Sequence, residues 1–245
     1  MRRRLLFLLA FTIVVAATAL QGAETAASRC ARLLDETKEL VWEASQDSSK
    51  AGAKRQKHRE AFSACREEGV PASLVSRAYV ASAIDQSNDR AEAIALLHEG
   101  LAHVGKVEGP EGPAAIVILD WLASMHNSDD ARSQGRLFAE RALALRKRHF
   151  GDISEETALG ITYLATFDRA DGNDSLAEKR YREAVQIART ACGERRPCEA
   201  LGSALSGIAR MIRKDPDRVE EADAMLDDII EALDGQRPPG PPRPQ

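Results

Sequence analysis

The chain has 245 residues and a formal net charge of −4, and 44% of its residues are apolar and 29% charged. This is the size and balance of one sizeable globular domain or two small ones, and the acidic charge argues against nucleic acid as a partner. Aromatic residues make up only 4%, while alanine, leucine, glutamate and arginine are common, so helices are favoured over sheets.

The first 23 residues have the layout of a secretory signal peptide. Arginines at 2–4 precede an uncharged, mostly apolar stretch at 5–20, and Ala-Thr-Ala at 17–19 fits a cleavage motif, with Ala23 as a second candidate. The stretch of sixteen residues falls short of the roughly 20 that an uncleaved anchor needs. Cleavage would change the net charge from −4 to −7. We therefore expect an exported protein without a membrane span; the arginine-rich composition favours a bacterial periplasm, with extracellular release as the alternative.

After the signal, residues 24–70 are predicted to form a helical hairpin, with helices at 26–47 and 52–67. The buried candidates of this pair are Leu33, Leu34, Leu40, Val41, Ala61 and Phe62. The hairpin does not share the repeat pattern that follows it, so we assign it as an amino-terminal cap with a polar outer face.

From residue 71 onward the sequence matches itself when shifted by 42 residues. The matched triplets are Ala81, Ala123 and Ala165; Leu101, Leu143 and Val185; Gly109, Gly151 and Gly193. Each unit is predicted to be two helices, most clearly at 157–170 and 175–191, which the turn DGND separates. Residues 114–121 (AAIVILDW) are rich in β-branched residues, but their register with alanine-rich helices in later units favours a helix over a buried strand.

This pattern resembles the tetratricopeptide repeat (TPR) in the 42-residue spacing of kinesin light chains. The family's Leu-Ala pair resembles Leu164-Ala165, its turn glycine resembles Gly172, and its second-helix series of small, large and small residues resembles Ala177, Tyr181 and Ala184. In two departures, Asp168 stands where the family has a late aromatic residue, and the closing proline is absent. The resemblance implies an all-α, right-handed solenoid of about four repeats over residues 71–234.

The four cysteines fall at helix ends that such hairpins bring together. Cys192 ends the second helix of one repeat and Cys198 begins the next, while Cys30 and Cys65 lie at neighbouring ends of the cap helices. We predict two disulfides, Cys30–Cys65 and Cys192–Cys198, as expected in an oxidising compartment. A redox centre would favour C-x-x-C beside a βαβ pattern, and a zinc site would need ligands closer than His149; both are disfavoured alternatives.

No catalytic motif is recognisable in the sequence. It contains no G-x-S-x-G, H-E-x-x-H or phosphate-binding glycine loop. The segment 168–174 resembles a calcium loop, but Lys179 occupies the position that requires a bidentate glutamate. We therefore predict no enzyme, no cofactor and no metal site.

The resemblance also implies a concave groove lined by the first helices of successive repeats. Carried over from the family, the candidate groove residues are Asp85, Asp120, Asn127, Thr162, Thr166, Arg169, Arg210, Arg213 and Lys214. Acidic residues thus lie toward the amino-terminal repeats and basic residues toward the carboxy-terminal ones. In the competing interpretation, the cations at the ends of these helices only complement the helix dipole.

The function that follows is a non-catalytic interaction scaffold or adaptor in the cell envelope. Its partner would be a protein or peptide, bound as an extended segment or short helix with an acidic group near Arg210, Arg213 and Lys214. The alternative is an envelope enzyme, or an enzyme's dedicated subunit, with an unrecognised active site. The proline-rich residues 235–245 cannot continue a helix and are predicted to be a disordered polyproline-II tail, or else a docking motif.

Overall fold

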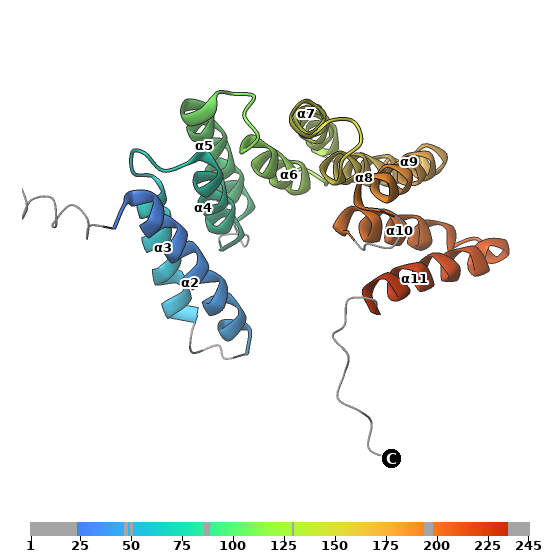
Figure 1. Ribbon diagram of the computed structural model, residues 1–245, viewed down its shortest axis with the longest axis horizontal. Helices are drawn as coiled ribbons and strands as arrows, with labels where there is room; N and C mark the ends of the chain where they lie inside the picture. The colour runs from blue at the N-terminus through green and yellow to red at the C-terminus, as the bar shows by residue number, and fades with distance from the viewer. Residues whose placement is uncertain are drawn as a thin grey trace, which may run out of the picture. The chain divides into compact units, whose positions relative to one another are not determined.

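The structure is a computed structural model that describes residues 24–46, 49, 51–85, 89–128, 130–193 and 198–234. The signal peptide predicted at 1–23 and the proline-rich tail predicted at 235–245 lie outside these residues. Over the described ranges the chain forms ten α-helices and the short 3-10 helix η2, without a strand (Figure 1). The predicted all-α class is confirmed.

The helix bounds follow the predicted elements closely. The helices are α2 (Ala26–Gln46), α3 (Ala51–Cys65), α4 (Ala72–Asp85), α5 (Arg90–Glu108), α6 (Ala115–Met125), α7 (Arg132–Phe150), α8 (Glu155–Ala170), α9 (Asp174–Cys192), α10 (Glu199–Ile212) and α11 (Val219–Asp234), with η2 at Pro216–Arg218. Most of AAIVILDW lies in α6, where Ile118 and Leu119 are fully buried. The helical interpretation of this segment is therefore confirmed.

The chain divides into two compact units after Asn88. In the first unit, α4 packs on α2 and α3, and the rings of Phe62 and Tyr79 meet edge to face with centroids 4.9 Å apart. An ion pair between Arg77 and Asp35 also joins α4 to α2. The boundary between compact units therefore falls one helix later than the predicted boundary between cap and array, because α4 buries its apolar side on the cap helices.

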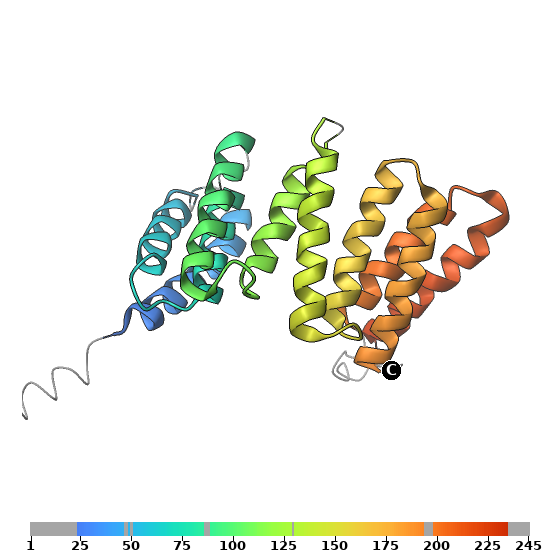
Figure 2. The ribbon, with the colours of Figure 1, turned by 90° about the horizontal axis from the view of Figure 1, so that it is seen from above.

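In the second unit, helices α5 to α11 pack on their sequence neighbours as antiparallel hairpins (Figure 2). Three helices of this unit, α5, α7 and α9, end at a glycine with positive φ: Gly109 at 94°, Gly151 at 87° and Gly193 at 86°. Each glycine amide donates to the carbonyl four residues earlier. A side chain is strained in this backbone conformation, so the 42-residue period of these glycines reflects a repeated helix ending.

Two arginines spaced by the same period join one repeat to the next. Arg90, at the start of α5, donates to the Met125 carbonyl oxygen at the end of α6. Arg132, at the start of α7, donates to the Ala170 carbonyl oxygen at the end of α8, 2.9 Å away. The last carbonyls of a helix lack partners within the helix, so each guanidinium satisfies a group at the end of the following repeat's first helix.

Alanine allows close packing of the helices that position the candidate site. Ala158, Ala177, Ala184 and Ala204 of α8, α9 and α10 are fully buried, and the larger Tyr181 fills the space beside them with 1% of its surface exposed. Gly207 of α10 lies against the Tyr181 ring, where an added Cβ would stand 2.3 Å from a ring carbon. The position of Tyr181 therefore depends on a glycine opposite it.

Among the helices that the structure describes, none combines the length and the apolarity that a bilayer crossing requires.

Candidate functional site

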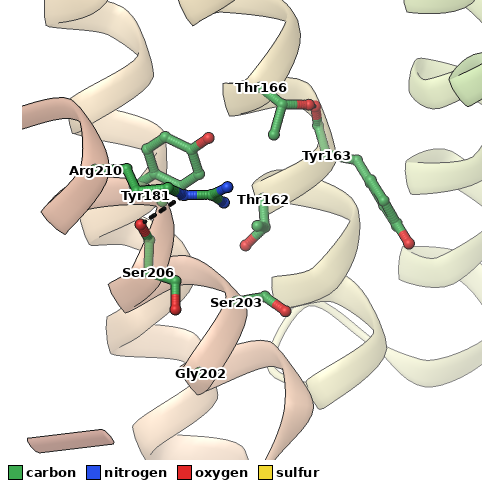
Figure 3. Close-up of a pocket in the computed structure, with 9 residues that line it drawn as sticks. Thr162, Tyr163, Thr166, Tyr181, Gly202, Ser203, Ser206 and Arg210 are labelled. Carbon is green, nitrogen blue, oxygen red and sulfur yellow. Dashed lines mark hydrogen bonds between the residues drawn. The ribbon is translucent and has the colours of Figure 1, made fainter. Parts of the chain in front are cut away.

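A hollow of about 340 Å³ lies between α8 and α10, and we call it the α8–α10 groove (Figure 3). Its lining residues are Thr162, Tyr163 and Thr166 of α8, Tyr181 of α9, and Gly202, Ser203, Ser206, Gly207 and Arg210 of α10. The groove is thus lined by the first helices of two successive repeats, as the family resemblance implies. Its floor is an aromatic ring, and hydroxyl groups occupy both walls.

The two threonine hydroxyl groups of the α8 wall already donate their protons to the backbone. The Thr162 hydroxyl donates to the Ala158 carbonyl oxygen at 2.9 Å, and the Thr166 hydroxyl donates to the Tyr163 carbonyl oxygen at 2.6 Å. Their remaining lone pairs can only accept hydrogen bonds. This wall therefore suits a ligand that presents N–H donors.

Two guanidinium groups, those of Arg169 and Arg210, lie near Tyr181. Arg210 is exposed, and its Nε donates to the Ser206 carbonyl oxygen at 3.3 Å. Burial raises the pKa of the Tyr181 phenol, and the charges of Arg169 and Arg210 oppose that rise, so both guanidinium groups act on this hydroxyl. The Nε of Arg169 is buried without a hydrogen-bond partner among the described residues.

The other predicted cations lie beyond the groove lining. Arg213 follows α10 and forms an exposed ion pair with Asp223 of α11, with 3.3 Å between nitrogen and oxygen. Lys214 is exposed next to it. Of the three cations predicted to hold an acidic group, Arg210 is the one that lines the hollow.

The predicted acidic residues are held in internal ion pairs. The Asp120 carboxylate accepts from Arg146 with one N–O distance of 2.9 Å, and Arg146 also lies over the Tyr163 ring, 5.7 Å from its centroid. Burial raises the pKa of Asp120, while Arg146 lowers it. This carboxylate therefore positions a groove residue through Arg146 and is not itself part of the groove lining.

Asp85 belongs to the first compact unit, where its carboxylate lies 3.0 Å from Lys54 Nζ and 3.6 Å from His58 Nδ1. Burial lowers the pKa of His58, and Asp85 opposes that shift. Asn127 is exposed after the end of α6. The structure thus brings Thr162, Thr166 and Arg210 together and leaves Asp85, Asp120 and Asn127 outside that set.

Four groove residues were not among those predicted from the sequence: Tyr163, Tyr181, Gly202 and Gly207. Tyr163 is 41% exposed and forms part of the α8 wall. Gly202 lies inside α10 with nothing within 4 Å of an added Cβ, so it leaves the α10 wall open. A glycine inside a helix costs about 0.5–1 kcal/mol relative to alanine, and that cost is the signal that could have identified Gly202.

The four cysteines form the two predicted pairs. Cys30 and Cys65 are fully buried, with Sγ atoms 2.08 Å apart. Cys192 and Cys198 are partly exposed, with Sγ atoms 2.34 Å apart and Cα atoms 6.3 Å apart. The second pair joins the end of α9 to the start of α10 and thereby fixes the end of the α10 wall.

No family model matches the chain, and no curated protein matches it in sequence. Among solved structures, BtubC (BKLC) from P. vanneervenii matches with a TM-score of 0.58 and 16% sequence identity, over 91% of this chain and 97% of that chain. A protein of Podosopora anserina, described as a kinesin light chain with nearly identical TPR-like repeats, matches with a TM-score of 0.55 and 17% identity, over 84% and 97% of the two chains. By fold, the chain is a TPR-like helical-repeat solenoid, as its 42-residue sequence pattern predicts.

Proposed function

We propose that this chain is a non-catalytic interaction scaffold of the cell envelope that binds a protein partner in the α8–α10 groove. The bound segment is an extended peptide or short helix, and its acidic group pairs with Arg210. The observation that carries the proposal is the exposed Arg210, which lines a groove whose walls carry hydroxyl groups.

Stacked helical hairpins support binding because their concave surface exists before the partner arrives. Little conformational freedom is then lost on the protein side of the interface. The hydroxyl oxygens of Thr162 and Thr166 would accept from the peptide's backbone N–H groups, since both hydroxyl protons are already donated to α8. A peptide backbone supplies such donors at regular intervals.

The lining of the groove favours binding over chemistry. All nine lining residues lie in the described part of the chain, and none of them carries a carboxylate, an imidazole or a thiol. A serine or threonine hydroxyl becomes a nucleophile when an adjacent general base takes its proton, and imidazoles and carboxylates supply most such bases. No observation in the groove therefore favours the alternative of an envelope enzyme.

The decisive test replaces both exposed arginines, as Arg210→Glu with Arg213→Glu, in the mature oxidised protein. An array of synthetic peptides would present each peptide sequence twice, once with aspartate and once with asparagine at the same position. The wild type is expected to retain the aspartate member of a pair, and the double variant to lose at least about tenfold in affinity, since a hydrogen bond to a charged group contributes roughly 1.5–3 kcal/mol.

The matched control is Arg55→Glu with Arg59→Glu, which makes the same charge change on α3 in the first unit. It is expected to leave retention unchanged. The exposed Arg213–Asp223 pair contributes at most about 1 kcal/mol, so the double variant should keep a nearly unchanged melting temperature. Unaffected retention by the Arg210→Glu, Arg213→Glu variant, or a large loss of its thermal stability, would refute the proposal.

A further inference from the structure

A second hollow, of about 590 Å³, surrounds the Cys192–Cys198 disulfide, and we call it the acidic pocket. Besides the two cysteines, three carboxylates line it: Glu155 and Glu156 at the start of α8, and Glu199 at the start of α10. The pocket therefore gathers negative charge around two sulfur atoms at the meeting point of α8, α9 and α10. Such a concentration of carboxylates attracts a cation.

Glu155 is held in a defined position at this meeting point. Ser154 caps α8 by accepting from the Thr157 amide at 3.1 Å, which fixes the first turn of the helix. One Glu155 oxygen then accepts from the Glu199 amide at 2.8 Å, across to the start of α10. A carboxylate oxygen of Glu155 and the Sγ atoms of Cys192 and Cys198 all lie within 4.8 Å of one another.

We propose that Cys192, Cys198 and Glu155 bind a borderline divalent cation such as Zn²⁺ when the disulfide is reduced. Two thiolates and a carboxylate are ligand types that Zn²⁺ takes in proteins, and water or Glu199 would complete a tetrahedron. The disulfide and the cation are alternatives, because both need the same two sulfur atoms. The assignment does not depend on the proposed function of the α8–α10 groove.

The disulfide is replaced by a bound cation in two steps, reduction and then metal binding. A dithiol reductant supplies two electrons and two protons, the Sγ–Sγ bond breaks, each sulfur becomes a thiol, and the reductant leaves as a disulfide. The cation then displaces both thiol protons into solvent. Zn–S bonds of about 2.3 Å at a tetrahedral angle place the sulfurs about 3.8 Å apart. Side-chain rotation reaches that separation from Cα atoms 6.3 Å apart.

The sequence alone argued against zinc because it offered no nearby histidine. The structure supplies the missing ligand from the start of the preceding repeat, where Glu155 stands beside both cysteines. A cation bound there would join α8, α9 and α10 at one point, whereas the disulfide joins only α9 and α10.

The test uses the full mature chain after mild reduction. Cys30 and Cys65 are fully buried while Cys192 and Cys198 are partly exposed, so the exposed pair should open first. Titration of two thiols per chain would establish that state. Co²⁺ then serves as the probe, since thiolate-to-cobalt charge transfer gives a near-ultraviolet band, and competition with Zn²⁺ gives the zinc affinity.

The expected result is one cation per reduced chain and none at this site in the oxidised chain. Glu155→Gln should weaken binding at least tenfold, because the amide keeps an acceptor for the Glu199 N–H but removes the anionic ligand. Glu156→Gln is the matched control, since it removes a charge from the same pocket outside the ligand set, and it should change affinity less than threefold. Bound Zn²⁺ should also slow reoxidation of the two thiols.

Three outcomes overturn the proposal. The first is absence of binding by a reduced chain whose circular dichroism shows unchanged helix content. The second is equal binding by the oxidised chain. The third is a Glu155→Gln variant that binds as tightly as the wild type, or no more weakly than Glu156→Gln.

Discussion

Replacement of Asp168 by asparagine should destabilise the second unit more than any comparable change at its surface. The Asp168 side chain is 1% exposed and accepts from Arg136 at 2.8 Å and from Arg180. Asparagine keeps the shape of the side chain and one acceptor oxygen but removes the negative charge. Two guanidinium groups then face a neutral side chain inside the repeat.

The size of the loss in unfolding free energy depends on the partners and the solvent contact that each arginine retains. Removal of one member of a fully buried ion pair costs about 3–5 kcal/mol. Here Arg136 retains Asp171 at 2.7 Å and is 23% exposed, whereas Arg180 is 28% exposed and loses its ion pair with residue 168. Water can solvate both groups in part, so we expect a loss of about 2–3 kcal/mol in the free energy of unfolding.

Urea unfolding at neutral pH measures this loss as a lower transition midpoint with an unchanged slope. The control is Asp152→Asn, because Asp152 is 82% exposed and its contact with Lys147 is 3.7 Å long, so the expected change is below about 0.5 kcal/mol. In an Arg180→Met background the cost of Asp168→Asn should fall by at least about 1 kcal/mol. A loss below about 1 kcal/mol in the wild-type background, or the same loss in both backgrounds, would show that the arginines do not depend on this carboxylate.

Two further predictions concern packing and acid stability. Gly207→Ala should cost about 1–3 kcal/mol, because its Cβ would stand 2.3 Å from the buried Tyr181 ring, whereas Gly202→Ala, with nothing within 4 Å, should be neutral or stabilising; equal melting temperatures would contradict the packing argument. Hydrogen bonds from Arg218, and then Arg182, lower the pKa of Glu178 to about 2. Since the pKa is lower in the folded state, this carboxylate stabilises the protein above about pH 4.5 and loses that effect as the pH falls toward 2. Glu178 is 23% exposed, so solvent screening reduces its contribution to about 1–2 kcal/mol, and the gap in urea midpoint between wild type and Glu178→Gln should narrow from pH 6 to pH 3. A gap that stays constant would exclude this linkage.

The fold could be predicted because its determinants recur along the chain. Alanine at close helix contacts and glycine at helix ends are local requirements, and a 42-residue shift makes both visible in the sequence. The cysteine pairing followed from the same hairpins, since each pair stands at helix ends that a hairpin brings together.

The partners of charged side chains could not be predicted in the same way. Asp120 appeared to be a groove charge, yet it pairs with Arg146 of the adjacent helix. Glu155 carried no signal in the sequence, and only the offset between successive repeats brings it to Cys192 and Cys198. That offset is the displacement at which the alanine-rich faces of neighbouring helices pack, and the repeat period does not specify it. The division after Asn88 falls inside the first predicted repeat, because α4 matches the repeat in sequence but packs on the cap helices.

The glycines at 109, 151 and 193 also bear on how an array of this kind changes length. Each of them has a similar backbone conformation at the equivalent position of its repeat. A gene segment copied from one such glycine to the next would therefore encode a helical pair whose two ends already fit the neighbouring repeats. Growth or shortening by whole units then requires no newly evolved connection. An insertion inside one of these helices would instead shift the glycine away from the helix end and place a side chain where the backbone conformation strains it.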